Sequence, residues 1–328
     1  MQKVIDVMKK RSKELLKDGV VNRVLAWQTG EFVYDQTPAV FTSEQEIEEN
    51  MVYDAFSAPN LSKYMIEESK KDGKILVFLK PCDTYSFNQL IKEHRVKRDK
   101  VYIVGIECNG KADINKIKEK GITGISSIEE TDDELICNTV YGVQKVKIED
   151  ILLEKCVNCK GKEHKIYDEL IVVNPIKEPN GNRFKEVEEI ENMTAEERFA
   201  FWQNELSKCI RCNACRNVCP ACSCLKCVFD NPESGVEGKS NPDSFEEQLF
   251  HIIRAYHVAG RCTDCGECSR VCPQGIPLHL LNRKFIKDLN EFYGDYQAGD
   301  DTETRPPLVN FTKEDMEPNA ISDKGGNE

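Results

Sequence analysis

The chain has 328 residues, of which 40% are hydrophobic and 31% are charged. This length predicts two domains, because a single hydrophobic core stops growing at roughly 250 residues. No apolar run approaches the roughly 20 residues that a bilayer-spanning helix needs, so we expect no membrane span. The net charge of −12 argues against a nucleic-acid partner, since phosphate binders present clustered positive charge. Proteins are the expected partners.

The first 18 residues mix Lys, Arg and Glu in an amphipathic pattern, without the apolar core and cleavage site of an export signal. We therefore expect a cytoplasmic protein. In that reducing compartment the sixteen cysteines indicate metal or redox chemistry rather than disulfides.

Residues 1–173 predict an α/β or α+β domain, because strand-like runs alternate with helical patterns. The runs 74–79 and 101–106 are short and rich in β-branched residues, which is typical of buried strands. Between them, 85–96 has helical spacing, with Asp83 or Thr84 as its cap. A hairpin is expected over 134–148.

Residues 174–193 are polar and rich in turn formers, and this pattern predicts a linker. A helical domain is expected over 194–290, beginning at a capping box, Thr194 to Glu197. A second helix is expected over 243–258, with an apolar face that ends at Gly260. Its expected apolar residues are Phe245, Leu249, Ile252, Ile253 and Tyr256. Residues 291–328 carry ten acidic against three basic side chains, which indicates an extended tail.

The strongest signal is a repeated cysteine motif. The spacing C-x2-C-x2-C-x3-C-P begins at Cys209 and again at Cys262, and it is the spacing of bacterial ferredoxins with 4Fe-4S clusters. Three thiolates on one tight turn can meet three corners of a cubic cluster, and in two-cluster proteins the fourth cysteine ligates the other cluster. We therefore assign Cys209, Cys212, Cys215 and Cys272 to a first cluster, and Cys262, Cys265, Cys268 and Cys219 to a second.

Structural zinc is disfavoured, because three ligands within seven residues would crowd one tetrahedral ion. Three more thiols follow at Cys222, Cys224 and Cys227, and their spacing is also compatible with metal ligation. Cys222 or Cys224 could replace Cys219 as the distant ligand. The competing interpretation is that these thiols tune a neighbouring cluster without binding iron.

The two motifs are separated by 42 residues that contain the predicted helix 243–258. In this respect residues 194–285 resemble the helical ferredoxin domain of succinate dehydrogenase iron–sulfur subunits and heterodisulfide reductase C subunits. The resemblance implies an all-α dicluster domain.

The first half supplies a further set of thiols. Cys82 and Cys108 each follow a predicted strand, and ligands of open α/β sheets bind at the carboxyl ends of strands. Cys156 and Cys159 add a nearby pair. These four predict a third 4Fe-4S cluster, whereas the alternative is that Cys82 and Cys108 are ordinary buried thiols. Cys137 has no cysteine neighbour and is expected in the core.

The run from Gly73 through Cys82-Asp83 to Cys108, with Cys156 and Cys159, resembles the iron–sulfur beta subunits of deazaflavin-dependent hydrogenases and formate dehydrogenases. The second half, with Cys222, Cys224 and Gly260, also resembles the beta subunit of soluble sulfhydrogenases and the iron–sulfur subunit of anaerobic sulfite reductase. The resemblance implies an electron carrier between a flavin- or nicotinamide-linked subunit and a catalytic partner. That partner could be a hydrogenase, a formate dehydrogenase, a sulfite reductase or a heterodisulfide-reductase-like flavoprotein.

Some members of that group hold FAD. This chain has Cys82-Asp83 where many flavin-binding relatives carry Cys-Gln, which argues against an intrinsic flavin.

No dinucleotide-binding or nucleotide-hydrolysing motif is present, and the five histidines show no metal-pair spacing and are expected at the surface or on helix faces. The chain is therefore expected to be a non-catalytic electron-transfer subunit. The alternatives are a flavin-containing subunit that itself reduces or oxidises a hydride carrier such as deazaflavin, and a zinc-bearing interaction module.

Overall fold

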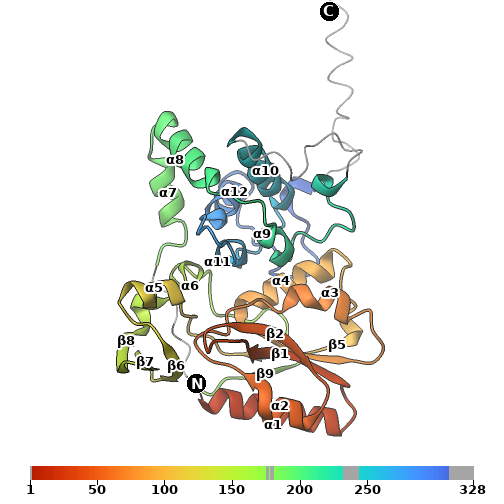
Figure 1. Cartoon of the computed structure of the whole chain (residues 1–328). Coiled ribbons are helices and arrows are strands. Elements are labelled where there is room, and N and C mark those ends of the chain that lie inside the picture. Colours follow the sequence, from red (N-terminus) through yellow and green to blue (C-terminus); the bar gives the residue numbers. More distant parts are fainter. Residues whose placement is uncertain (1, 175–176, 178–180, 232–243, 310–328) are drawn as a thin grey trace, which may run out of the picture.

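The computed structural model of the chain describes residues 2–174, 177, 181–231 and 244–309. Figure 1 shows an α/β half formed by the first part of the chain and a helical half formed by the second. The elements of the first half are α1 (Gln2–Lys17), β1 (Arg23–Thr29), β2 (Gln36–Phe41), α2 (Glu44–Asn50), β3 (Met51–Val52), α3 (Met65–Glu68), β4 (Ile75–Leu79), α4 (Pro81–Lys92), β5 (Val101–Ile106), α5 (Ile114–Glu119), β6 (Ile125–Glu130), β7 (Glu134–Thr139), β8 (Gly142–Lys147), α6 (Glu154–Val157) and β9 (Glu169–Ile171). Those of the second are α7 (Lys185–Glu191), α8 (Ala195–Ser207), α9 (Ala214–Val218), α10 (Ser244–Val258), α11 (Glu267–Arg270) and α12 (Leu278–Tyr293).

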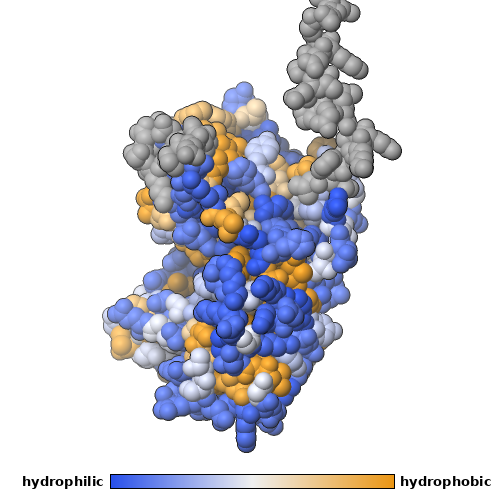
Figure 2. Space-filling model, turned by 90° about the vertical axis from the view of Figure 1, so that its right-hand side faces the viewer, coloured by the Kyte–Doolittle hydropathy of each residue, from blue (hydrophilic) through white to orange (hydrophobic). Residues whose placement is uncertain are grey.

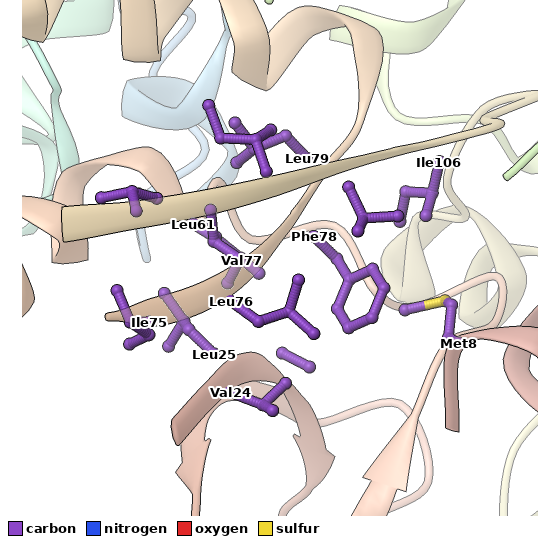
Figure 3. Packing of buried hydrophobic residues seen from close by; sticks show 14 of the residues in the cluster. Met8, Val24, Leu25, Leu61, Ile75, Leu76, Val77, Phe78, Leu79 and Ile106 are labelled. Carbon is purple, nitrogen blue, oxygen red and sulfur yellow. The ribbon is translucent and has the colours of Figure 1, made fainter. Parts of the chain in front are cut away.

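The main sheet has the strand order β2-β1-β4-β5-β9, and β3 also pairs with β1. β1, β4, β5 and β9 run parallel, while β2 and β3 are antiparallel to β1. Helices α1 and α2 cover one face of the sheet, and α3 and α4 lie on the side of the helical half (Figure 1). Because both faces are covered, the central strand β4 is buried along its whole length. Figure 3 shows its Phe78 directed toward Met8 of α1.

The two predicted strands are confirmed as β4 and β5, which pair in parallel. The predicted helix between them forms, but its expected start was wrong. α4 begins at Pro81, with Lys80 rather than Asp83 or Thr84 at the N-cap. Proline fits the first turn of a helix because the N–H that it lacks would have no partner there.

The predicted hairpin is confirmed as β7 and β8, and β6 extends it to a separate three-stranded sheet. Cys137 lies on β7 and is fully buried in the core of this sheet, as expected. This sheet therefore accounts for that cysteine without a ligand role.

Helices dominate from residue 185 onward. Thr194 accepts a hydrogen bond from Glu197 N, and Glu197 accepts from Thr194 N, so the predicted capping box starts α8. The expected linker 174–193 contains α7, whose Val187 is buried. Five residues of that linker, 175–176 and 178–180, lie outside the described residues.

The second predicted helix is confirmed as α10, but its expected apolar face was wrong. Phe245 and Tyr256 are 71% and 64% exposed, and Ile252 is also exposed. The buried face instead carries Glu247 and Arg254 among apolar residues. Its remaining buried members are Phe250, His251, Ala255 and Val258.

The expected tail begins later than predicted, because α12 continues to Tyr293. The chain after α12 also packs on the first half: Asn88 of α4 donates a hydrogen bond to Gly299 O (3.1 Å), and Lys165 forms an ion pair with Asp300. Residues 310–328 of the expected tail lie outside the described residues.

In the part of the chain that the structure describes, every helix is too short or too polar to cross a bilayer. The face in Figure 2 is mostly hydrophilic and carries small hydrophobic patches in both halves.

Candidate iron–sulfur centres

Four cysteines of the first half gather at the carboxyl edge of the main sheet. Cys82 lies in the first turn of α4, just after β4, and Cys108 follows β5. The parallel pairing of β4 with β5 brings these two positions together, as the sequence predicted. Cys156 lies on α6 and Cys159 just beyond it, and all four line one cavity.

Lysines make this cavity electropositive. Burial alone would lower the pKa of Lys162, but Cys108, Cys159, Cys156 and Cys82 together raise it, so this ammonium group faces all four thiols. Burial likewise favours the neutral form of Cys108, yet Lys111, Lys162 and Lys80 hold its pKa below the ordinary value. The lysines thus favour the thiolate of Cys108, the form that binds metal, whereas burial raises the pKa of Cys82 and of Cys156.

The two ferredoxin motifs share one unusual backbone conformation. In the first, Arg211 and Asn213 have φ of 51° and 60°. At the equivalent positions of the second, Asp264 and Gly266 have φ of 52° and 65°. Such left-handed residues turn consecutive N–H groups toward a common anion. The N–H of Arg211 points at Cys209 Sγ, 3.4 Å away.

The fourth cysteine of each motif lies beside leading cysteines of the other. Cys272 of the second motif lines one cavity with the three leading cysteines of the first, Cys209, Cys212 and Cys215. Cys219 of the first motif packs against Cys262. Burial raises the pKa of Cys262, and the charges of Asp264, Cys219 and Cys265 raise it further. The structure thus brings together the thiols of both predicted sets.

The spacing of the thiols distinguishes a cluster from a single ion. Among the described residues, no three cysteine sulfurs lie within 4.8 Å of one another. Four sulfurs around one zinc ion, at about 2.3 Å from the metal, would lie about 3.8 Å apart. The thiols of each set, called a cage below, are therefore spaced more widely than the sulfurs around one zinc ion. Each cage consists of thiols, the ligands of 4Fe-4S clusters, so the residues fit a cluster.

Cys222, Cys224 and Cys227 together line a further cavity, which Arg216 and Arg254 also border. A hydrogen bond from Cys222 is the main reason that the pKa of Cys219 falls to about 6. Cys224 is exposed, and the thiol of Cys227 lies beside Arg216. Cys222 therefore adjoins Cys219 of the second set.

The cations beside the two motifs each have an acidic partner: Lys208 with Glu205, Arg211 with Glu247, Arg216 with Asp230, Arg261 with Glu93 and Arg270 with Glu267.

The buried polar face of α10 was not predicted from the sequence. Its His251 lies on a helix face, as expected of the histidines, but this face is buried: His251 is 2% exposed and lines the cavity of the first set. His279 is buried as well, at 4% exposure. The spacing of Glu247, His251 and Arg254 on one helix face was the available signal.

The three sets of thiols follow one another in space. The cavity of the first half is also lined by Cys265, a member of the second set. Cys268 of the second set and Cys215 of the first belong to one buried cluster. The second set therefore lies between the other two.

Comparison with known proteins agrees with these features. Residues 205–276 match the model of the 4Fe-4S dicluster domain. The chain is 26% identical to the F420-dependent formate dehydrogenase subunit beta of Methanocaldococcus jannaschii, over 92% of this chain and 93% of that protein. It is 28% identical to subunit beta of F420-dependent formate dehydrogenase 1 of Methanococcus maripaludis, over 90% of this chain and 91% of that protein.

A similar solved structure is a chain of the F420-reducing [NiFe] hydrogenase complex from Methanosarcina barkeri, at 14% identity and a TM-score of 0.39. The match covers 48% of this chain and 62% of that one. The two beta-subunit relatives match nearly the whole chain, and the dicluster match falls on the paired motifs. Over nearly its whole length the chain thus resembles beta subunits of F420-dependent formate dehydrogenases, its second half carries a 4Fe-4S dicluster domain, and it is an electron-transfer subunit of an oxidoreductase.

Proposed function

We propose that this subunit relays electrons through three 4Fe-4S clusters arranged in series. One cluster is held in the first half, and the second and first clusters of the dicluster domain follow it. The ligands are Cys82, Cys108, Cys156 and Cys159, then Cys262, Cys265, Cys268 and Cys219, then Cys209, Cys212, Cys215 and Cys272.

The observation that carries this proposal is the continuity of the three sets. Cys265 borders the cavity of the first half, and Cys268 packs in one cluster with Cys215. A bound cluster supplies one-electron chemistry with a potential set by its surroundings. The second motif is held against the first half by the ion pair of Glu267 with Lys155 and by the hydrogen bond between Thr263 and Ser86.

The relatives named above are subunits of F420-dependent formate dehydrogenases. By this likeness, electrons pass between a flavoprotein or deazaflavin-linked subunit and a catalytic partner of the hydrogenase, formate dehydrogenase, sulfite reductase or heterodisulfide-reductase type, in the cytoplasm. Exposed large apolar side chains on α8 and α10, among them Phe199, Phe245 and Tyr256, support contact with partner subunits.

The domain organisation that accompanies this function has a first domain over 1–173, a connecting segment over 174–193 and the dicluster domain over 194–290. Two features support it: the change from sheet to helix after β9, and the dicluster match within the second domain. Limited proteolysis tests it, with first cleavage expected between residues 174 and 193.

Cofactor analysis of the anaerobically purified full chain tests the relay. We expect iron and acid-labile sulfide in equal amounts, at the level of three clusters, and no flavin. Zinc without sulfide would refute the relay in favour of a zinc-bearing module. Stoichiometric FAD would favour the alternative in which this subunit itself exchanges hydride with a carrier.

A further inference from the structure

One face of α10 is both polar and buried. Glu247, His251 and Arg254 follow one another at helical spacing, and their exposed fractions are 2%, 2% and 4%. Burying such groups is costly unless each finds a hydrogen-bonding or charged partner. The role of this face therefore follows from the groups that each of the three side chains can hydrogen-bond or pair with.

Glu247 is satisfied by protein. The guanidinium of Arg211 donates to both of its carboxylate oxygens at 2.8 Å. This pair lies beside the first set of thiols, because Arg211 belongs to the first motif. Glu247 therefore needs no further partner.

His251 is not satisfied in this way. Neither ring nitrogen has a hydrogen-bond partner among the described residues. The ring lines the cavity of Cys209, Cys212, Cys215 and Cys272. A ring nitrogen of His251 and the sulfur of Cys209 lie within 4.8 Å of one another. An imidazole always carries at least one N–H, so this ring can donate a hydrogen bond into the cavity.

Arg254 is the second unsatisfied group. Its Nε and Nη1 have no hydrogen-bond partner within the described ranges, and it appears in none of the ion pairs found there. Burial alone would lower its pKa, but the thiols of Cys268, Cys215, Cys219 and Cys222 raise it. Cys215 and Cys219 belong to the first motif and Cys268 to the second, and the guanidinium also hydrogen-bonds to Cys268. The charge of Arg254 is thus shared between the first and second sets.

We propose that α10 sets the reduction potentials of the two clusters of the dicluster domain, with Arg254 as a positively charged donor shared by both and His251 as a donor to the first cluster alone. The inference rests on the proposed function, since it requires that the thiols hold clusters. Both residues are positioning residues, which act on the electron carriers through charge and hydrogen bonds.

The physical reason is electrostatic. Reduction adds negative charge to a site whose thiolates are already negative, and cations and N–H donors stabilise the more negative state. Removing either group must therefore lower the midpoint potential of each cluster that it contacts. In a buried site such interactions are poorly screened by solvent, so the shift is measurable.

Potentiometric titration of the full chain, followed by electron paramagnetic resonance, tests this. The first cluster is identified by a Cys212→Ser variant, which alters the signal of the cluster that this residue ligates. In His251→Leu we expect a lower midpoint for the first cluster and an unchanged midpoint for the second. His251→Gln keeps a donor and should restore most of the shift.

Arg254→Gln should lower both midpoints, and Arg254→Lys, which keeps the charge, should lower them less. A matched control is His257→Leu, because His257 lies on the exposed side of the same helix. It should leave both potentials unchanged.

Iron and sulfide content separates the possible failures. If wild-type protein lacks iron and sulfide, the proposed function itself fails. If the variants retain both clusters with unshifted potentials, only this inference is overturned. If Arg254→Gln does not assemble clusters, the iron content of Arg254→Lys is compared with it. Iron that is restored in Arg254→Lys supports a role of the positive charge, and loss of iron in both variants overturns a role of the charge.

Discussion

Lys155 and Glu267 form a buried ion pair that joins the two halves of the molecule. Lys155 precedes Cys156 of the first half, and Glu267 precedes Cys268 of the second motif. Their side chains are 7% and 0% exposed. Glu267 also accepts hydrogen bonds from Arg270 and from Asn60 N. The contact therefore fixes one cysteine cage relative to the next.

Replacing Glu267 by glutamine should destabilise the protein strongly. Glu267→Gln leaves the buried ammonium of Lys155 and the half-buried guanidinium of Arg270 without their carboxylate, and loss of one partner of a buried pair costs about 3–5 kcal/mol. Lys155→Met should cost less, because Glu267 keeps Arg270. The measurement is the urea midpoint for loss of iron–sulfur absorbance under anaerobic conditions.

Glu67→Gln is the control, because Glu67 forms an ion pair with Lys70 at the surface, with side chains 72% and 54% exposed. Such pairs contribute at most about 1 kcal/mol. Equal midpoints for Glu267→Gln and Glu67→Gln would show that the buried pair does not hold the two halves together.

Gly266 is required for two independent reasons. Its φ is 65°, and a Cβ at this position would collide with the Cβ of Lys155. We expect Gly266→Ala to lower iron content, because relieving the collision displaces either α6 or the turn that carries Cys265. Iron and sulfide per chain provide the measurement.

Gly275→Ala is the matched control. Gly275 has nearly the same φ, 64°, but nothing lies within 4 Å of a Cβ there. Its cost is the backbone strain alone, about 1–2 kcal/mol. Iron content should remain at the wild-type level in this variant. If Gly275→Ala loses as much iron as Gly266→Ala, the approach of Lys155 is not what requires glycine at 266.

The sequence predicted those features that depend on local spacing. The strands β4 and β5, the capping box at Thr194 and the hairpin of β7 and β8 each follow from patterns within a few residues. The proximity of Cys82 and Cys108 was predicted because each follows one of two parallel neighbouring strands, β4 and β5. Long-range partners carry no such local pattern, so the contact of Lys155 with Glu267 could not be predicted.

The face of α10 shows a second limit. Periodicity assigned Phe245 and Tyr256 to the core, because apolar residues normally occupy the buried face of a helix. In this helix the buried face points at thiols: Arg254 faces the charges of Cys268, Cys215 and Cys219, and a ring nitrogen of His251 lies within 4.8 Å of Cys209 Sγ. The prediction failed because polar side chains, and not apolar ones alone, occupy the buried face of a helix next to a candidate functional site.

The third cluster can be tested by removing two of its predicted ligands. In a Cys156→Ala, Cys159→Ala double variant we expect iron to fall by about a third, since one of three clusters of equal size is lost. The dicluster signals should persist, because their ligands are untouched. Cys137→Ala is the control, since this thiol is fully buried but lies in the β6–β8 sheet, whereas Cys156 and Cys159 are partly buried. Unchanged iron in the double variant would refute the assignment.

The fourth ligand of the second cluster can be identified by comparing two neighbouring thiols. Cys219 packs against Cys262, and the hydrogen bond from Cys222 lowers the pKa of Cys219 to about 6. The same hydrogen bond raises the pKa of Cys222, so Cys219 is the thiolate of the pair. We therefore expect Cys219→Ser to lose or alter the second cluster, whereas Cys222→Ser keeps its iron and shifts only its potential. Cys224→Ser, at an exposed thiol, should match wild type. If Cys222→Ser loses iron and Cys219→Ser retains it, Cys222 and not Cys219 is the fourth ligand of the second cluster.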